Sequence, residues 1–283
     1  MIAISTLAFL EQYSVEEIIA VAQDHGWMLE FTSSFPYREG VDLVFRQATV
    51  ARLPHNYFPP PAAPFVLNLA STDPKIRERS IAHCQQGIRL AAEADSPFYA
   101  AHAGFCLDPS PHQLGHPLEI AQSFHRPVHW DLFLNSIRSI LATTQSTQVP
   151  FLIENNVLAS FNLTSKGGNP LLCVDAGEII SLVKAVDDER FGLLLDTAHL
   201  KVSSCTLGFD LEAAVRDLQP FVKGIHHSDN DGQTDTNDPL DENYWFAPWI
   251  PAFRHLTHVL EVKRRPIVDI QRMIQLLTQW QNE

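Results

Sequence analysis

Residues 191–201, FGLLLDTAHLK, contain an Asp and a His that could take part in chemistry. The short apolar run predicts a strand buried on both faces, and Asp196 lies where that strand would reach the surface. His199 follows three positions later. Side chains of these types at the carboxyl end of one strand can point into the same mouth and hold a metal ion or a proton. Alternatively, Asp196 caps a turn and His199 is simply exposed, so the interpretation depends on how the other strands end.

Five other apolar segments also end in a histidine or a carboxylate. They read RLPHNYF, FYAAHAGF, PFLIENN, KGIHHSDN and HVLEV, and each predicts one strand. The residues at their ends are His55, His102, Glu154, His226 and Glu261. A single histidine of this kind usually has a structural role, whereas six such strand ends in one chain favour a common site.

The rest of the chain supplies the elements that would position these residues. Two further predicted strands, IAIST and WMLEFTSS, come first, and segments with helical periodicity follow nearly every strand. Asp175 with Glu178 predicts a helix start, and the helix after FGLLLD is expected to begin at Asp210. Long loops are expected at about residues 106–127 and 231–257.

Eight strands, nearly all followed by a helical segment and without a break in composition, describe a single (β/α)8 TIM barrel that spans residues 1–283 as one domain. The length of 283 residues also suits this fold. In a TIM barrel the carboxyl ends of all strands open into one mouth. The six histidines and carboxylates are therefore expected to converge, although they lie far apart in the sequence.

The composition narrows the class of protein. Four widely separated cysteines, without a C-x-x-C pair, fit reduced thiols, so a metal would be bound by His, Asp and Glu. The 20 Lys and Arg against 33 Asp and Glu give a net charge of −13, which counts against nucleic acid as a partner, although a local basic groove could still exist. No run has the length of a membrane span and the first residues lack the basic start of a secretory signal, so we expect a cytoplasmic protein without membrane contact.

Several of these motifs together resemble the xylose-isomerase-like TIM barrels, a family that includes sugar isomerases and epimerases and the apurinic endonuclease IV group. The motifs are LPHNYF, AHAGF, LIENN, LLLDTAH, IHHSDNDGQTD and LEVK, and they span essentially the whole chain. The most specific are D-x-x-H at Asp196 and His199 and H-x-S-D-N at residues 226–230. In such barrels the glutamate after strand five, the aspartate after six, the histidine after seven and the glutamate after eight hold one divalent metal. The resemblance therefore implies a metal site at Glu154, Asp196, His226 and Glu261.

The chemistry of this residue set agrees with that implication. Carboxylate and imidazole ligands without thiolate suit Zn²⁺ or Mn²⁺. Such an ion would acidify the carbon-bound proton beside a substrate carbonyl and stabilise the enediolate. Glu154 and Glu261 are the candidate catalytic residues, because carboxylates on two non-adjacent strands can flank a substrate and remove and return that proton. The expected function is thus a metal-dependent isomerase or epimerase that acts on a sugar or sugar phosphate.

The chain also departs from the one-metal pattern, which keeps two other functions open. His55 and His102 match histidines that endonuclease IV uses for a second ion, so one or two ions per chain are expected. His199 and Asp235 match members of its third site, where that group has D-x-H and this chain has Asn237. Because an amide is a weak zinc ligand, an endonuclease IV-like phosphodiesterase is only the second interpretation. A non-catalytic metal-binding barrel is the third.

The remaining expectations concern the substrate and partners. We assign His199, Asp235 and Lys263 to substrate contacts. Lys263 with Arg264 could bind a phosphate or a sugar hydroxyl, although a surface charge at a helix start is the commoner explanation. The aromatic residues 244–253 could form a lid that stacks on a small-molecule sugar, or the contact of a homodimer. The histidines expected to be solvated or structural are His112, His116, His125, His129 and His227.

Overall fold

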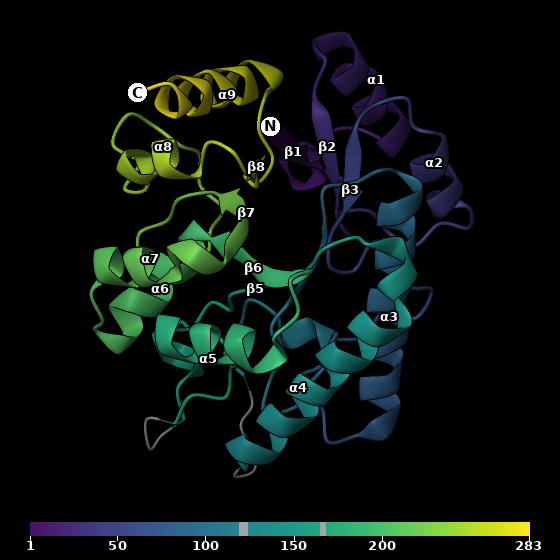
Figure 1. Ribbon diagram of the computed structural model, residues 1–283. Coiled ribbons are helices and arrows are strands. Elements are labelled where there is room, and N and C mark those ends of the chain that lie inside the picture. Colours follow the sequence, from purple (N-terminus) through teal and green to yellow (C-terminus); the bar gives the residue numbers. More distant parts are fainter. Residues whose placement is uncertain (119–123, 165–167) are drawn as a thin grey trace.

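The computed structural model describes residues 1–118, 124–164 and 168–283. In this part of the chain, eight parallel strands form a nearly closed barrel with helices around its outside (Figure 1). The strands are β1 (Ile2–Ser5), β2 (Met28–Phe31), β3 (Arg52–Pro54), β4 (Tyr99–His102), β5 (Phe151–Glu154), β6 (Phe191–Asp196), β7 (Val222–His227) and β8 (Thr257–Leu260). Their order is β3-β2-β1-β8-β7-β6-β5-β4, and β3 and β4 meet through a parallel bridge between His55 and Ala100. The predicted single (β/α)8 TIM barrel is confirmed.

Helices connect successive strands along the outside of the barrel. The α-helices are α1 (Val15–His25), α2 (Val41–Gln47), α3 (Pro74–Glu93), α4 (Arg126–Thr143), α5 (Ala176–Val186), α6 (Thr197–Leu207), α7 (Leu211–Leu218), α8 (Ile250–Phe253) and α9 (Ile267–Gln281). The short 3-10 helices are η1 (Thr6–Phe9), η2 (Pro111–Gln113), η3 (Gln145–Thr147), η4 (Ser160–Asn162), η5 (Gln219–Phe221) and η6 (Ala247–Trp249). Among the described helices, none combines the length and the apolar character needed to cross a bilayer.

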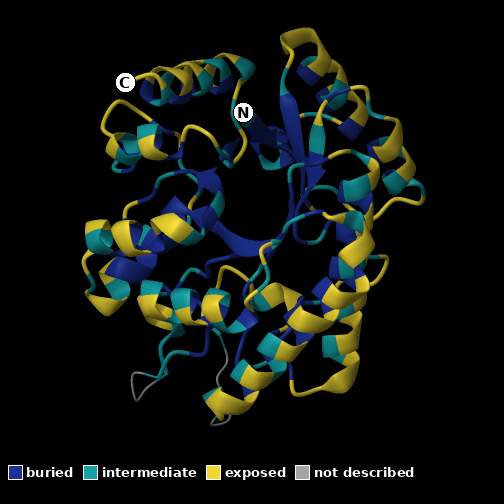
Figure 2. Cartoon of the chain, viewed as in Figure 1, coloured by how far each residue is buried: buried dark blue, intermediate teal, exposed yellow. Residues whose placement is uncertain are grey.

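The strands are buried on both faces, as the apolar runs predict, and Figure 2 shows the barrel wall in the colour of buried residues. All six positions of β6, FGLLLD, are buried. A small apolar cluster, to which most of the strands contribute, includes Ala3, Met28, Leu53, Ala100, Leu152, Leu194 and Val259. The larger cluster packs the outer strand side chains against the helices. Parallel strands with this packing leave one polar face, at their carboxyl ends, for a site.

Helix α6 differs from the prediction, because it begins directly after β6, whereas the next helix was expected only at Asp210. Asp196 is its N-cap, and the Oδ1 atom accepts a hydrogen bond of 2.7 Å from the backbone N–H of His199. Asp210 does cap a helix, but this is α7. The sequence of α6 lacks a one-sided apolar pattern, because the helix is buried on several sides.

The aromatic residues 244–253 also differ from the expectation of a lid or a dimer contact. Tyr244 and Phe246 are only 2% and 0% exposed, and Trp245 and Trp249 are half-buried. The Tyr244 hydroxyl lies 2.6 Å from the Thr197 hydroxyl, so this ring belongs to the core. The two buried rings therefore cannot stack on a substrate, and the homodimer stays a prediction.

The two predicted long loops contain more regular structure than expected. The first includes η2, and α4 already begins at Arg126, while residues 119–123 of this loop lie outside the described residues. The second includes η6 and α8. At the start of α5, Asp175 caps the helix as predicted. Glu178, however, does not return to the cap, because its carboxylate binds Arg126.

Candidate metal centre

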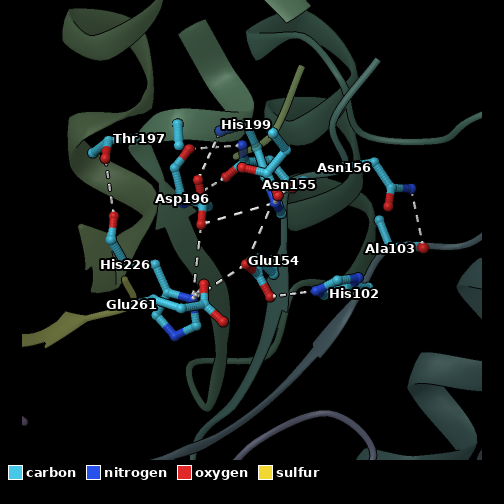
Figure 3. A network of polar contacts seen from close by, with 12 residues as sticks. His102, Ala103, Glu154, Asn155, Asn156, Asp196, Thr197, His199, His226 and Glu261 are labelled. Atoms are coloured by element: carbon cyan, nitrogen blue, oxygen red, sulfur yellow. Dashed lines mark hydrogen bonds and ion pairs between the residues drawn. The ribbon is translucent and has the colours of Figure 1, made fainter. Parts of the chain in front are cut away.

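Four of the predicted residues come together at the carboxyl ends of four consecutive strands of the barrel wall (Figure 3). Glu154 ends β5, Asp196 ends β6, His226 lies in β7, and Glu261 directly follows β8. One nitrogen or oxygen atom of each lies within 4.8 Å of those of the other three. The first three side chains are fully buried, and that of Glu261 is 12% exposed. We call these residues the four-residue group.

His226 lies at the centre of the four-residue group and directs one ring nitrogen to it. Its Nδ1 atom is 2.8 Å from Glu261 Oε2, 3.2 Å from Glu154 Oε1 and 3.8 Å from Asp196 Oδ2. Its Nε2 atom lies 2.9 Å from Glu30 Oε1, in hydrogen-bond geometry. When the ring is neutral, an N–H at Nε2 can donate a hydrogen bond to Glu30, and the Nδ1 lone pair then faces the three carboxylates.

Glu30 belongs to the site although the sequence did not single it out. It is fully buried at the end of β2, and its Oε1 atom also lies 3.8 Å from His55 Nδ1. One atom each of Glu30, His55 and His226 forms a further group that could hold a metal. Within the strand MLEF the residue looked like any polar strand position, and the one available signal was its place at the carboxyl end of a predicted strand.

A second group joins His55, His102 and Glu154. The Glu154 Oε2 atom lies 3.2 Å from His55 Nε2 and 3.0 Å from His102 Nε2, whereas its Oε1 atom faces His226. The Glu154 carboxylate thus lies between the two groups, with one oxygen for each. His102 is the most accessible of the three, with 36% of its side chain exposed.

The residues predicted to contact substrate lie in two places. His199 is buried, and its Nε2 atom lies 3.2 Å from Asp235 Oδ2 beside the four-residue group. Its Nδ1–H donates to the Asn155 carbonyl at 2.8 Å. Lys263 is exposed and outside these groups. The exposed position predicted for His199 by the alternative interpretation is therefore wrong.

Asn237 does not take the place of a third-site ligand. Its side-chain amide instead donates a hydrogen bond to the Glu261 carbonyl oxygen at 3.4 Å. The Asn237 amide is thus used in a hydrogen bond within the chain.

The charges of the site strongly perturb its titrating groups. Burial opposes ionisation of Glu154, but the neighbouring His102, His226 and His55 hold its pKa well below the usual range. Burial, together with the charges of Glu154, Asp235 and Glu261, raises the pKa of Asp196 to about 8, against the opposing effect of His199. The clustered carboxylates therefore repel one another, and a bound cation would relieve that repulsion.

The neighbouring carboxylates raise the pKa values of two histidines in the site. Burial alone would lower the pKa of His226, but Glu30, Glu261 and Glu154 together raise it well above its ordinary value. The same balance of burial against the charges of Asp196 and Asp235 raises the pKa of His199. In the ion-free protein these two rings therefore supply the positive charge that compensates the carboxylates.

The unpartnered atoms of the site fit a metal ion. Buried side-chain atoms without a hydrogen bond include both Glu154 oxygens, Asp196 Oδ2 and His226 Nδ1. Several of them are close together, yet the contacts lack hydrogen-bond geometry, and such buried polar atoms are costly unless something binds them. All the donors are oxygen or imidazole nitrogen, which suits Zn²⁺ or Mn²⁺. The residues present thus fit a divalent metal, and their roles as ligands stay predictions.

The other histidines serve the structure or face solvent. His227 is buried, with Nδ1 3.0 Å from the Tyr244 hydroxyl and Nε2 2.8 Å from His258 Nδ1, and burial first of all holds its pKa well below the ordinary value. His129 is buried against the Ala70 carbonyl at 2.8 Å. The exposed histidines of the first long loop are His112, His116 and His125.

Comparisons with known proteins agree with this architecture. The model of the xylose isomerase-like TIM barrel family matches residues 7–270. A D-tagatose 3-epimerase-like protein has a TM-score of 0.73 at 18% identity, with 99% of this chain and 97% of that chain covered. The TTHB071 protein from Thermus thermophilus, soaked with ZnCl2, has a TM-score of 0.67 at 17% identity, with 98% of each chain covered.

D-psicose 3-epimerase from Clostridium cellulolyticum, solved with D-tagatose, has a TM-score of 0.67 at 16% identity, with 99% of this chain and 98% of that chain covered. At such identities these structures share the fold alone with this chain. None of the curated proteins matches the sequence. The family model, by contrast, extends over nearly the whole length, so this chain belongs to the xylose isomerase-like TIM barrel family.

Proposed function

We propose that this protein is a divalent-metal-dependent isomerase or epimerase that acts on a sugar or a sugar phosphate. The observation that carries the proposal is the four-residue group, in which two carboxylates from different strands approach one imidazole nitrogen. Glu154 Oε1 and Glu261 Oε2 lie 3.2 Å and 2.8 Å from His226 Nδ1. The shared fold with a D-psicose 3-epimerase and a D-tagatose 3-epimerase-like protein supports a sugar as the substrate.

In this proposal Glu154, Asp196, His226 and Glu261 hold one ion, and His55 and His102 with Glu154 can hold a second. A bound Zn²⁺ or Mn²⁺ supplies Lewis acidity, which lowers the pKa of the proton on the carbon beside a substrate carbonyl. Asp196 is placed by α6, because Oδ1 is used as the helix cap and Oδ2 is left for the ion. Glu30 orients His226 by accepting a hydrogen bond from Nε2–H.

Glu154 and Glu261 move the proton. Glu154 stays ionised because three histidines surround it, so it is present in the form that a base requires. Glu261 comes from the opposite side of His226 and is partly exposed, so it can reach the substrate from the solvent side. His199 and Asp235, paired at 3.2 Å, and Lys263 bind substrate hydroxyls or a charged substituent.

A metal-dependent phosphodiesterase of the endonuclease IV kind is the second candidate. The group of His55, His102 and Glu154 favours it, since two adjacent ions can activate water and stabilise a leaving oxygen. The structural use of Asn237 and the net charge of −13 count against it. A third candidate, a non-catalytic metal-binding barrel, would neither exchange a carbon-bound proton nor cleave a phosphodiester.

The test is deuterium uptake from heavy water into candidate ketoses, in parallel with cleavage of abasic DNA. We expect uptake by the wild type and its loss by about 10²–10⁴-fold in Glu261→Gln at saturating metal, because an amide cannot transfer the proton. Glu212→Gln removes the same charge at an exposed position of α7 outside the potential metal groups, and it should leave uptake unchanged. Asn237→His should not create cleavage of abasic DNA.

Two outcomes would contradict the proposal. Cleavage of abasic DNA by the wild type without deuterium uptake would favour the phosphodiesterase. Metal binding without either activity would favour the non-catalytic barrel. Metal content is measured for each variant, so a loss of activity through loss of the ion is distinguished from a loss of proton transfer.

A further inference from the structure

A basic hollow of about 510 Å³ opens on the same face of the barrel as the metal centre. The residues that line it are Leu10, Glu11, Thr236, Lys263, Arg264 and Arg265. They belong to the segments that follow β1, β7 and β8, which are neighbours in the barrel wall. Loops after the seventh and eighth strands are a frequent place for phosphate binding in TIM barrels.

The backbone of this hollow is fixed relative to the metal centre. The N–H of Lys263 donates to the Asn237 carbonyl at 3.0 Å, and the N–H of Arg265 donates to the Ala8 carbonyl at 2.7 Å. The Asn237 side chain in turn donates to the carbonyl of Glu261. Lys263 is two residues beyond Glu261, so their Cα atoms are at most about 7 Å apart. The lining of the hollow and the four-residue group are therefore neighbours along the chain after β8.

Two of the three cations in the hollow are free to bind a ligand. Arg264 forms an ion pair with Glu11, so these two charges compensate each other. Within the described residues, the side chains of Lys263 and Arg265 form no ion pair or hydrogen bond, and Arg265 Nε is buried without a partner. The other two arginines with a buried unpaired nitrogen use their remaining guanidinium nitrogens in hydrogen bonds. Arg265 thus differs from them in that no guanidinium nitrogen has a hydrogen-bond partner among the described residues.

We propose that Lys263 and Arg265 bind the phosphate of a phosphorylated ketose whose carbonyl end lies at the four-residue group. The inference rests on the proposed function and selects sugar phosphates within it. Two adjacent cations compensate a phosphate dianion, whereas a sugar hydroxyl would leave both charges uncompensated. The Thr236 hydroxyl already donates to Asp238 at 2.6 Å, so Lys263 and Arg265 are the groups that bind the phosphate in this proposal.

The negative charge of the rest of the protein favours a local basic site for such a substrate. The chain has a net charge of −13, and the mouth contains several carboxylates, so an anionic substrate is repelled except at a basic position. A phosphate held beside β8 directs the opposite end of an open-chain sugar toward Glu154 and Glu261. The hollow therefore determines the orientation of the substrate as well as its affinity.

The experiment compares each of two ketoses with its terminal phosphate ester: ribulose with ribulose 5-phosphate, and fructose with fructose 6-phosphate. Deuterium uptake gives KM and kcat, and calorimetry gives the dissociation constant. The variants are Lys263→Ala, Arg265→Ala and Arg265→Lys. Arg216→Ala is the matched control, because Arg216 is an exposed cation on α7 without a side-chain partner in the described residues.

We expect the wild type to have at least a tenfold lower KM for a phosphorylated ketose than for its free form. Lys263→Ala and Arg265→Ala should each raise the KM for the phosphorylated form about tenfold or more, and by a clearly larger factor than the KM for the free form. Arg265→Lys should recover part of the loss, and Arg216→Ala should have no effect. Lys263 is exposed, so its variant tests the site even if Arg265→Ala fails to fold.

Equal KM values for both members of a pair, or uptake by the free ketoses alone, would overturn the phosphate site and leave the proposed function intact. The absence of uptake from all four sugars would overturn the proposed function. In that case, the dissociation constant from calorimetry tests the phosphate site in the hollow separately from the activity. Binding of a phosphorylated ketose that Lys263→Ala weakens supports the site, and no binding overturns it.

Discussion

Replacing Asp196 by Asn separates the two roles of this side chain. Oδ1 caps α6 at 2.7 Å from the His199 N–H, whereas Oδ2 is buried, unpartnered and directed to the four-residue group. Asn is as good an N-cap as Asp, so the helix start is preserved. The variant loses only the negative charge at the ion position. We therefore expect metal affinity to fall by more than the roughly 10–100-fold typical of outer partners of a ligand.

The ion-free variant should, in contrast, be more stable than the ion-free wild type. Burial and three carboxylates raise the pKa of Asp196 from 3.8 to about 8. Because the folded pKa is the higher one, this group destabilises the fold increasingly as the pH rises from 3.8 to 8. At pH 7, about 3 pH units above 3.8, this destabilisation amounts to roughly 4 kcal/mol, and it is absent when Asn replaces Asp.

The assay combines chelator competition for metal affinity with urea denaturation in the presence of chelator at pH 7. Asp229→Asn is the matched control, since Asp229 is paired with Lys201 at 2.6 Å outside the potential metal groups. Equal losses of metal affinity in both variants would refute the assignment of Asp196 as a ligand. A destabilised ion-free Asp196→Asn protein would refute the electrostatic reasoning.

Three further predictions concern other parts of the molecule. Glu30→Gln should weaken metal binding about 10–100-fold, because the charge that orients His226 is lost, and unchanged affinity in chelator competition would contradict this. Gly87→Ala should cost about 1–3 kcal/mol in urea denaturation, because the new Cβ would lie 2.2 Å from the Tyr99 ring, and an unchanged midpoint would contradict that contact. Burial lowers the pKa of His83 from 6.5 to about 4, so the stability present above pH 6.5 is lost as the pH falls toward 4, by up to about 3 kcal/mol. His83→Gln should make this decline shallower, and identical pH profiles of unfolding free energy for both proteins would show the reasoning to be wrong.

The barrel and the convergence of its strand ends could be predicted because both depend on local patterns. Each apolar run contained its own terminal His or carboxylate, and the parallel fold brought them together without further information. Glu30 was overlooked because its importance arises from His226, 196 positions away in the sequence. A single strand gives no sign of such a partner.

The errors in the helices and loops also have tertiary causes. Helix α6 is buried on several sides, so the one-sided apolar pattern that indicates a surface helix was missing. Tyr244 and Phe246 looked like candidates for a lid, but Thr197 and His227 provide the Tyr244 hydroxyl with buried partners. The Glu178 carboxylate accepts a hydrogen bond from Arg126, 52 positions earlier in the sequence, instead of returning to the N-cap of α5.

The bridge between His55 and Ala100 closes the barrel between its first and last strands in spatial order, β3 and β4. Among the described residues it is the ladder contact that joins β3 to β4, so the two ends of the wall are held by little main-chain pairing. His55 lies on one side of this gap, and His102 and Glu154 lie on the other. An ion shared by these three side chains would hold β3 against β4 and β5. Amide hydrogen exchange in β3 and β4 would then slow on metal binding more than in β6 and β7, which links occupancy of the mouth to the closure of the whole wall.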